Sequence, residues 1–264
     1  MIRIAFFSCV AMSSLMAQRP AEPMDGYAVL ERMHAAYAGH WYSNLVFVQR
    51  TTLFKVGGEK DTATWYEALK GPDALRIDLG VPRAGRGIIT TAESSFVFRD
   101  SQPIRVVADG NPFLPFVMGA YLQPVARTAE GASHHGFDLQ RMFVGAWEGH
   151  RTYVVGATDV SDTTAPEFWV DAERLVLVRM RVPLKTGGSQ LDIRLGGYVP
   201  VGDGWLATHV EISREGKPIQ FEDYLEWSDG IVIPDSLFNR TRWVSGGHWA
   251  DAPRTGPVWH HRSE

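Results

Sequence analysis

The chain has 264 residues, of which 45% are apolar and 21% charged, and its formal net charge is −4 at pH 7. This is the composition of a globular protein, and it excludes a disordered or fibrous chain. A negative charge without a basic stripe also argues against nucleic acid as a partner, because nucleic-acid binding needs a basic surface.

Residues 1–17 have the layout of a secretory signal peptide. Arg3 precedes the apolar run IAFFSCVAM, and the small residues of SSLMA come before Gln18. About a dozen apolar residues are too few to span a bilayer, and an apolar first helix of the domain is the alternative. Cys9, the single cysteine, lies in this run and comes too early for a lipid anchor. We therefore expect a periplasmic or secreted protein without disulfides or a thiol nucleophile.

The next part of the chain predicts one helix and then a series of strands. Residues 27–38 place apolar side chains on one helical face, with Asp25 as the N-cap and Gly39 as the stop. The glycines of KVGGEK predict a tight hairpin between the runs LVFVQRTTLF and DTATWYEAL. The short runs ALRIDL, RGIITT, SSFVF and PIRVVA continue this series of strands.

The segment 111–122, NPFLPFVMGAYL, is apolar on every side of a helix. Such a helix cannot be half exposed. It is either a helix buried in the core or a lid over a cavity, and the sequence leaves both open. The polar residues 127–136, RTAEGASHHG, predict a loop. As a lid, the apolar helix would present Phe113, Phe116, Val117 and Tyr121.

Between residues 166 and 238, apolar and charged residues alternate, and turns with glycine recur between the runs. This period-2 pattern predicts an antiparallel sheet with one apolar face and one wet face. Parity along the strands assigns Gln220 and Glu222 to the wet face. The residues predicted to line a cavity on the apolar face are Phe47, Leu75, Ile77, Phe96, Phe98, Val176, Met180, Leu191 and Ile193.

No linker or repeat divides the mature chain, so residues 18–240 predict one domain. Residues 241–264 form an aromatic C-terminal tail with little periodicity. The tail contains Trp243, Trp249 and Trp259, which are costly to leave in water. We therefore expect it to dock on the domain rather than hang free.

Familiar catalytic and metal-binding patterns are not found in the sequence. Ser94 and Ser95 lack the glycines of a nucleophile elbow. The pairs His134-His135 and His260-His261 have no further ligands at a recognisable spacing. Glu222 and Asp223 lie on opposite faces of one strand and cannot share a proton. The sequence therefore predicts neither an enzyme nor a metal or cofactor site.

Four pieces of the chain resemble the outer-membrane lipoprotein-sorting, or LolA/LolB-like, family of bacterial carriers. They are KGPDALRIDL, NPFLPFVMGAYL, FWVDAERLVLVRM and GWLATHVEISREGKPIQFEDY with the later IPDSLF. The resemblance implies a mainly β (α+β) fold, an incomplete antiparallel β-barrel (half-barrel) with helical lids over an apolar concave face. In that family the cavity holds lipoprotein acyl chains. An arginine that latches the lid precedes the proline there, but the matching residue here is Gly71, so the cavity is carried over and the release mechanism is not.

Together, these features favour an exported envelope carrier that binds a lipid or lipoprotein acyl chain non-covalently. An envelope membrane protein is a further candidate partner. The alternative is an envelope sensor or scaffold with the same fold, which would contact another protein through the tail from Trp243 onward. An exported hydrolase has the least support, because no nucleophile, base and orienting group can be assembled.

Overall fold

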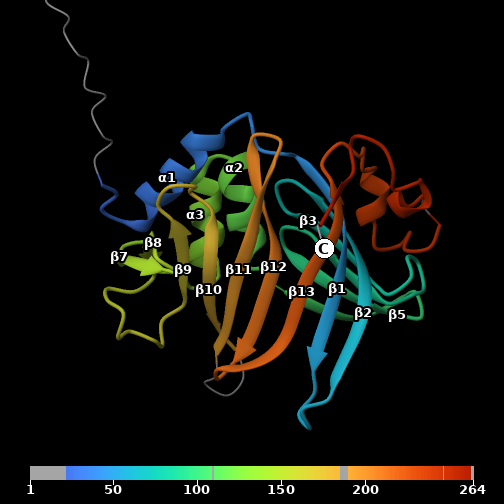
Figure 1. Ribbon diagram of the computed structural model, residues 1–264, viewed down its shortest axis with the longest axis horizontal. Coiled ribbons are helices and arrows are strands. Elements are labelled where there is room, and N and C mark those ends of the chain that lie inside the picture. The colour runs from blue at the N-terminus through green and yellow to red at the C-terminus, as the bar shows by residue number, and fades with distance from the viewer. Residues whose placement is uncertain (1–21, 109, 185–189, 246, 263–264) are drawn as a thin grey trace, which may run out of the picture.

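The computed structural model describes residues 22–108, 110–184, 190–245 and 247–262. This part of the chain forms one antiparallel sheet that curves around a group of helices (Figure 1). The predicted signal peptide, residues 1–17, lies outside the described residues. Among the described helices, none is both long enough and apolar enough to cross a membrane.

The first six strands form a meander in which each strand pairs with the next one along the chain. Short runs bounded by turns produce this arrangement, and Gly58 turns between the first two strands with a positive φ of 84°. The strands are β1 (Asn44–Phe54), β2 (Lys60–Lys70), β3 (Ala74–Leu79), β4 (Gly87–Thr90), β5 (Ser94–Arg99) and β6 (Gln102–Ala108).

A second meander makes the other half of the sheet, and its last long strand pairs with β1. The first and last long strands therefore lie at the centre, and β6 and β7 are the two edges. The strands are β7 (Met142–Trp147), β8 (His150–Val155), β9 (Glu167–Asp171), β10 (Leu177–Pro183), β11 (Gln190–Val201), β12 (Gly204–Arg214) and β13 (Lys217–Ser228), with the short β14 (His260–His261) beside β13.

Bulges in the central strands accompany the curvature of the sheet. The pairing shifts between Val48 and Gln49 of β1, and again between Ile212 and Ser213 of β12. A bulge adds a residue to one strand, which bends and twists it. The two edge strands do not pair with each other, so the barrel stays open. The predicted half-barrel is confirmed.

Helix α1 (Gly26–Tyr37) lies against the concave face near the β7–β10 side (Figure 1). Asp25 caps it as predicted, because its Oδ1 accepts the backbone N–H of Ala28 at 2.8 Å. The apolar stripe of the helix, Val29, Leu30 and Met33, is fully buried in the main core. Burial of this stripe fixes the helix on the sheet.

Between the edge strands, the chain crosses the concave side as a π-helical turn η1 (Pro115–Gly119), α2 (Ala120–Leu122) and α3 (Val125–His134). The loop predicted for residues 127–136 is therefore wrong over most of its length. Thr128, Ala129 and Ala132 are buried on one face of α3. Their small side chains let α3 pack closely on α1 and η1, although the segment looks polar as a whole.

The C-terminal tail packs on the convex face, beside the β1–β5 half of the sheet (Figure 1). The short helical turn η2 (Asp235–Phe238) leads into the tail, and η3 (Trp249–Asp251) lies within it. Trp243 stacks on Phe98 with ring centroids 4.4 Å apart. Trp249 and Trp259 cover the convex side of β1 and β2. All three tryptophans are at most 7% exposed. The tail therefore shields this part of the convex face from solvent.

Candidate functional site

A cavity of ≈ 240 Å³ lies between the concave face and the crossing helices. Aliphatic and aromatic side chains make up most of its wall, which is typical of sites for small apolar ligands. From the sheet and the chain before it come Trp41, Tyr42, Phe47, Glu67, Leu69, Leu75, Ile77, Val176, Leu177, Leu195, Tyr198, Trp205, Leu206, Ala207, Val210, Ile212, Glu222 and Tyr224. From the crossing segment come Asn111, Phe113, Leu114, Phe116, Val117 and Tyr121.

Eight of the thirteen residues that the sequence proposed for the cavity and its lid lie in this wall. The proposed lining residues there are Phe47, Leu75, Ile77 and Val176, and the proposed lid residues there are Phe113, Phe116, Val117 and Tyr121. The crossing helices thus bring the proposed lid against the proposed floor. The remaining five residues, Phe96, Phe98, Met180, Leu191 and Ile193, do not line the cavity.

Phe96 and Phe98 lie on the opposite, convex face. Residues paired across antiparallel strands share a face, and Val97 pairs with Ile88, which pairs with Ile77 in the cavity wall. The neighbours of Val97 therefore point away from the cavity, where Phe98 meets Trp243. Parity defines two sets within a strand, but it does not say which set faces the core when both sets are apolar.

Met180, Leu191 and Ile193 lie on the half of the sheet that the helices cover. Met180 is fully buried and Ile193 is 2% exposed, in the same core as α1, and Leu191 packs against that core. The concave face is thus divided. Helices fill its β7–β10 side, whereas the cavity remains over the central strands and β3.

The crossing segment is both core and cavity wall, which combines the two roles that the sequence left open. Phe116 is fully buried and packs on Phe168 and Phe137, at ring-centroid distances of 4.3 and 5.3 Å. Phe113 and Val117 are only partly buried and also line the cavity. Phe116 therefore anchors the segment, while Val117 presents an apolar surface to the cavity.

Tyr121 connects the crossing segment to neighbouring parts of the chain. Its ring stacks on Trp41 with centroids 3.7 Å apart, and its hydroxyl donates to the carbonyl of Leu175 at 2.9 Å. The Nδ1 of His34 in α1 lies 3.2 Å from the carbonyl oxygen of Ala120. These contacts join the segment to α1 and to the β9–β10 turn.

Gly71 lies where the chain approaches the crossing helices most closely. A Cβ atom at this position would be 2.1 Å from Cδ1 of Leu122 and 3.4 Å from Cε of Met118. A longer side chain at this position requires Leu122 to move. Lys70 and Arg76 do not take the place of the family's latch arginine. Lys70 forms an ion pair with Asp235 at 2.5 Å, and Arg76 donates a hydrogen bond to the carbonyl of Trp243 in the tail. The position of the family's latch is thus filled by a leucine of the crossing segment.

Replacing Gly71 by alanine is expected to displace Leu122 and loosen the crossing segment, since the added methyl group overlaps its side chain. Overpacking of this kind costs about 1–3 kcal/mol. Urea unfolding measures the cost, and limited proteolysis within residues 111–135 reports the loosening. Gly247→Ala is the control, because a Cβ there meets nothing within 4 Å. Equal stability of both variants and the parent would contradict the close approach.

Sequence reasoning missed two acidic residues in the wall. Glu67 has the same parity as Leu69 and pairs with Phe47, so its inward direction was readable from the sequence. Glu222 was assigned to the wet face, which is wrong. In β13, Glu226 pairs with Val48 but Tyr224 pairs with Gln49, so Leu225 is an extra, bulged residue. The alternation of side chains between the two faces of the sheet shifts by one residue at this bulge.

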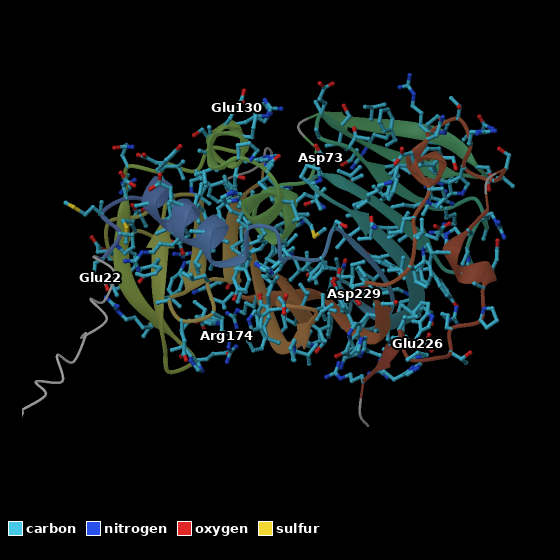
Figure 2. All side chains as sticks on the ribbon, turned by 90° about the horizontal axis from the view of Figure 1, so that it is seen from above. Glu22, Asp73, Glu130, Arg174, Glu226 and Asp229 are labelled. Atoms are coloured by element: carbon cyan, nitrogen blue, oxygen red, sulfur yellow. The ribbon has the colours of Figure 1, made fainter. Side chains whose placement is uncertain are left out.

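A second groove of ≈ 380 Å³ lies outside the crossing helices and has both polar and apolar residues in its wall. Asp73, after β2, and Glu130, on α3, line it from two sides and lie on the same side of the molecule in Figure 2. His134 and His135 also belong to it. Within the described part of the chain, no group of three or more His, Cys, Asp or Glu side chains is placed to hold a metal ion.

Comparison with known proteins rests on the fold. No family model and no curated sequence match the chain. An outer-membrane lipoprotein-sorting domain of Vibrio parahaemolyticus is 12% identical, with a TM-score of 0.57 over 83% of this chain and 97% of that chain. A LolA-superfamily protein of Nitrosomonas europaea is 14% identical, with a TM-score of 0.53 over 82% and 98%. A DUF1329-family protein of Desulfovibrio piger is 14% identical, with a TM-score of 0.54 over 81% and 95%.

These neighbours establish the architecture as the open half-barrel of LolA-like lipoprotein-sorting proteins, in agreement with the resemblance read from the sequence. Identities of 12–14% establish the fold alone.

Proposed function

We propose that this chain is an exported envelope carrier that binds a lipid or lipoprotein acyl chain non-covalently in the cavity under its crossing helices. The observation that carries the proposal is the cavity itself, which is apolar over most of its wall and lies in a fold shared with lipoprotein-sorting proteins. A periplasmic location fits the predicted signal peptide.

Burial of a hydrocarbon tail supplies enough free energy for such a carrier. Each CH₂ group removed from water contributes ~0.8 kcal/mol, so an acyl chain of about 14 methylenes gains about 11 kcal/mol. Most of this gain is offset when the chain leaves a membrane or micelle. A carrier then needs only a cavity that binds the acyl chain slightly better than the membrane does, and a crossing segment that can open. No covalent step is needed.

The site test is to replace Val117 by aspartate. Val117 is partly buried at the cavity wall, so a carboxylate there is expected to abolish uptake of a fluorescent fatty alcohol while the fold is retained. Phe116 is a poor choice for a charge, because it is fully buried in the core. Val232→Asp is the control, since Val232 is 88% exposed. Circular dichroism checks the fold of both variants.

Mass spectrometry of material extracted from the purified protein tests the function directly. A carrier is expected to retain or take up lipid. If neither the parent protein nor the control variant takes up lipid, the carrier proposal fails. The alternative, a scaffold that uses the tail as its contact, is weakened because the three tryptophans of the tail are buried on the chain's own sheet.

A further inference from the structure

Two carboxylic acids lie in the wall of the otherwise apolar cavity, Glu67 on β2 and Glu222 on β13. Glu67 is 6% exposed, and among the described residues no hydrogen bond or ion pair to its carboxyl group offsets the effect of burial. Glu222 differs, because it accepts a hydrogen bond from Nε2 of Gln220 at 2.5 Å. A buried, unpartnered acid that faces a cavity is costly to keep unless something else satisfies it.

Aromatic rings surround this acid. Phe47 is the cross-strand partner of Glu67, and Tyr224 stacks on Phe47 with centroids 4.2 Å apart. The face of an aromatic ring carries negative potential and attracts cations. Glu67, Phe47 and Tyr224 thus form a wall that favours positive charge.

Among the described residues, the cavity wall holds hydrogen-bond donors, such as the indole N–H of Trp41, but no cationic side chain. Of its tyrosines, Tyr42 donates to the carbonyl of Trp205 at 3.2 Å, and Tyr198 donates to the carbonyl of Leu177. None of the described cavity-lining residues is lysine or arginine. A ligand is therefore the natural source of positive charge beside the acids.

The charged groups near Glu67 and Glu222 do not supply a positive charge inside the cavity. His209 interacts with Glu222 from the other face of the sheet, but its ring nitrogens contact Asp223 at 2.9 Å and Glu211 at 3.3 Å. Burial raises the pKa of Glu67 well above its usual range, and repulsion by Glu222 adds to the effect. Burial also raises the pKa of Glu222 to about 7, against hydrogen bonds from Gln220 and Gln49. A cation bound beside the acids would favour their charged forms and lower both pKa values.

We propose that Glu67, with Glu222 and the rings of Phe47 and Tyr224, binds the protonated amine of a cationic amphiphile whose hydrocarbon chain fills the apolar remainder of the cavity. The inference rests on the proposed function, because it assumes that the cavity accepts an alkyl chain. A fatty carboxylate would be repelled by the acids in their charged form. A neutral alcohol or ester lacks the charge that the acids and the rings favour.

Titration calorimetry with three twelve-carbon ligands, below the concentrations at which they aggregate, tests this preference. At pH 8 dodecylamine is expected to bind about tenfold or more tightly than dodecanol, because a charge-assisted hydrogen bond is stronger than a neutral one. Dodecanoate is expected to bind most weakly. An alkyl amine stays protonated at both pH 5.5 and pH 8, as the lysine side chain does. At pH 5.5 the advantage of the amine should shrink, since the acids then keep their protons.

Glu67→Gln keeps the shape of the side chain and removes its charge. It is expected to abolish most of the advantage of dodecylamine over dodecanol at pH 8. Glu215→Gln, in the exposed turn between β12 and β13, is the matched control and should bind all three ligands as the parent does. Thermal unfolding confirms that both variants are folded.

The outcomes separate this inference from the proposed function. Equal binding of amine and alcohol at both pH values, or an unchanged amine preference in Glu67→Gln, overturns the cation site and leaves the carrier intact. Absence of binding by all three ligands overturns the carrier proposal as well.

Discussion

Replacing Arg76 by alanine is expected to lower the free energy of unfolding by about 3–5 kcal/mol, the usual cost of breaking a buried ion pair. Arg76 is 2% exposed and bonds both carboxylate oxygens of Asp78, at 2.8 and 3.1 Å. It also donates to the carbonyls of Leu237 and Trp243, each at 3.1 Å, and its guanidinium lies 4.0 Å from the ring centroid of Trp243. The substitution therefore leaves a buried charge and releases the tail. Urea unfolding measures the loss.

Arg127→Ala is the matched control, because Arg127 pairs with Glu130 at the surface and both side chains are more than 60% exposed. Exposed pairs contribute about 0–1 kcal/mol. A loss for Arg76→Ala no larger than for this control would contradict the role assigned to the buried pair. Fluorescence of the tail tryptophans should shift to longer wavelength only in Arg76→Ala.

The same ion pair gives the protein a dependence on acid pH. Burial raises the pKa of Asp78, but hydrogen bonds from His248 and Arg76 outweigh it and lower the pKa to about 2, from 3.8. A lowered carboxyl pKa stabilises the fold above the ordinary value, and the stabilisation is lost as the pH falls from near 4 through about 2. In Arg76→Ala, stability should change less over this range. An equally steep loss in both proteins would assign the acid sensitivity to other carboxyl groups.

Replacing Phe116 by alanine is the second change with a large expected effect, about 3–5 kcal/mol of unfolding free energy. The side chain is fully buried between Phe137 and Phe168, so its removal leaves a void. The void adjoins the cavity, because Phe116 also lines it. The variant is therefore expected to be less stable and yet to have a larger cavity. Urea unfolding and binding of alcohols of increasing chain length measure the two effects.

Phe113→Ala is the control for this change, since Phe113 lines the same cavity but is only partly buried. We expect it to cost clearly less stability. If both phenylalanines cost the same, the crossing segment is not anchored through Phe116.

Local pattern predicted much of the fold. The alternation of apolar and charged residues gave an antiparallel sheet, and Asp25 and the apolar stripe gave α1 to within one residue at each end. The apolar segment 111–122 was predicted as a helix, with core and lid both left open, and it is helical from Pro115 onward. These features depend on neighbours in the chain, which is why the sequence shows them.

Features that depend on distant contacts were not predicted. Phe98 was assigned to the cavity face, but it lies on the convex face against Trp243, which is 145 positions further along the chain. Glu222 could not be assigned because the bulge at Leu225 is a property of the pairing with β1. The small residues of α3 were read as a loop, since their burial depends on helices from other parts of the chain.

The pairing of β1 with β13 has a consequence for how the chain folds as it is made. Val46 lies opposite Ser228, so the middle of the sheet joins two segments from nearly opposite ends of the chain. Contacts with so large a sequence separation form late, because a long loop must close first. The half-barrel cannot be completed until almost the whole polypeptide has emerged from the ribosome. A chain that stays unfolded during synthesis is in the state that threading through a membrane pore requires.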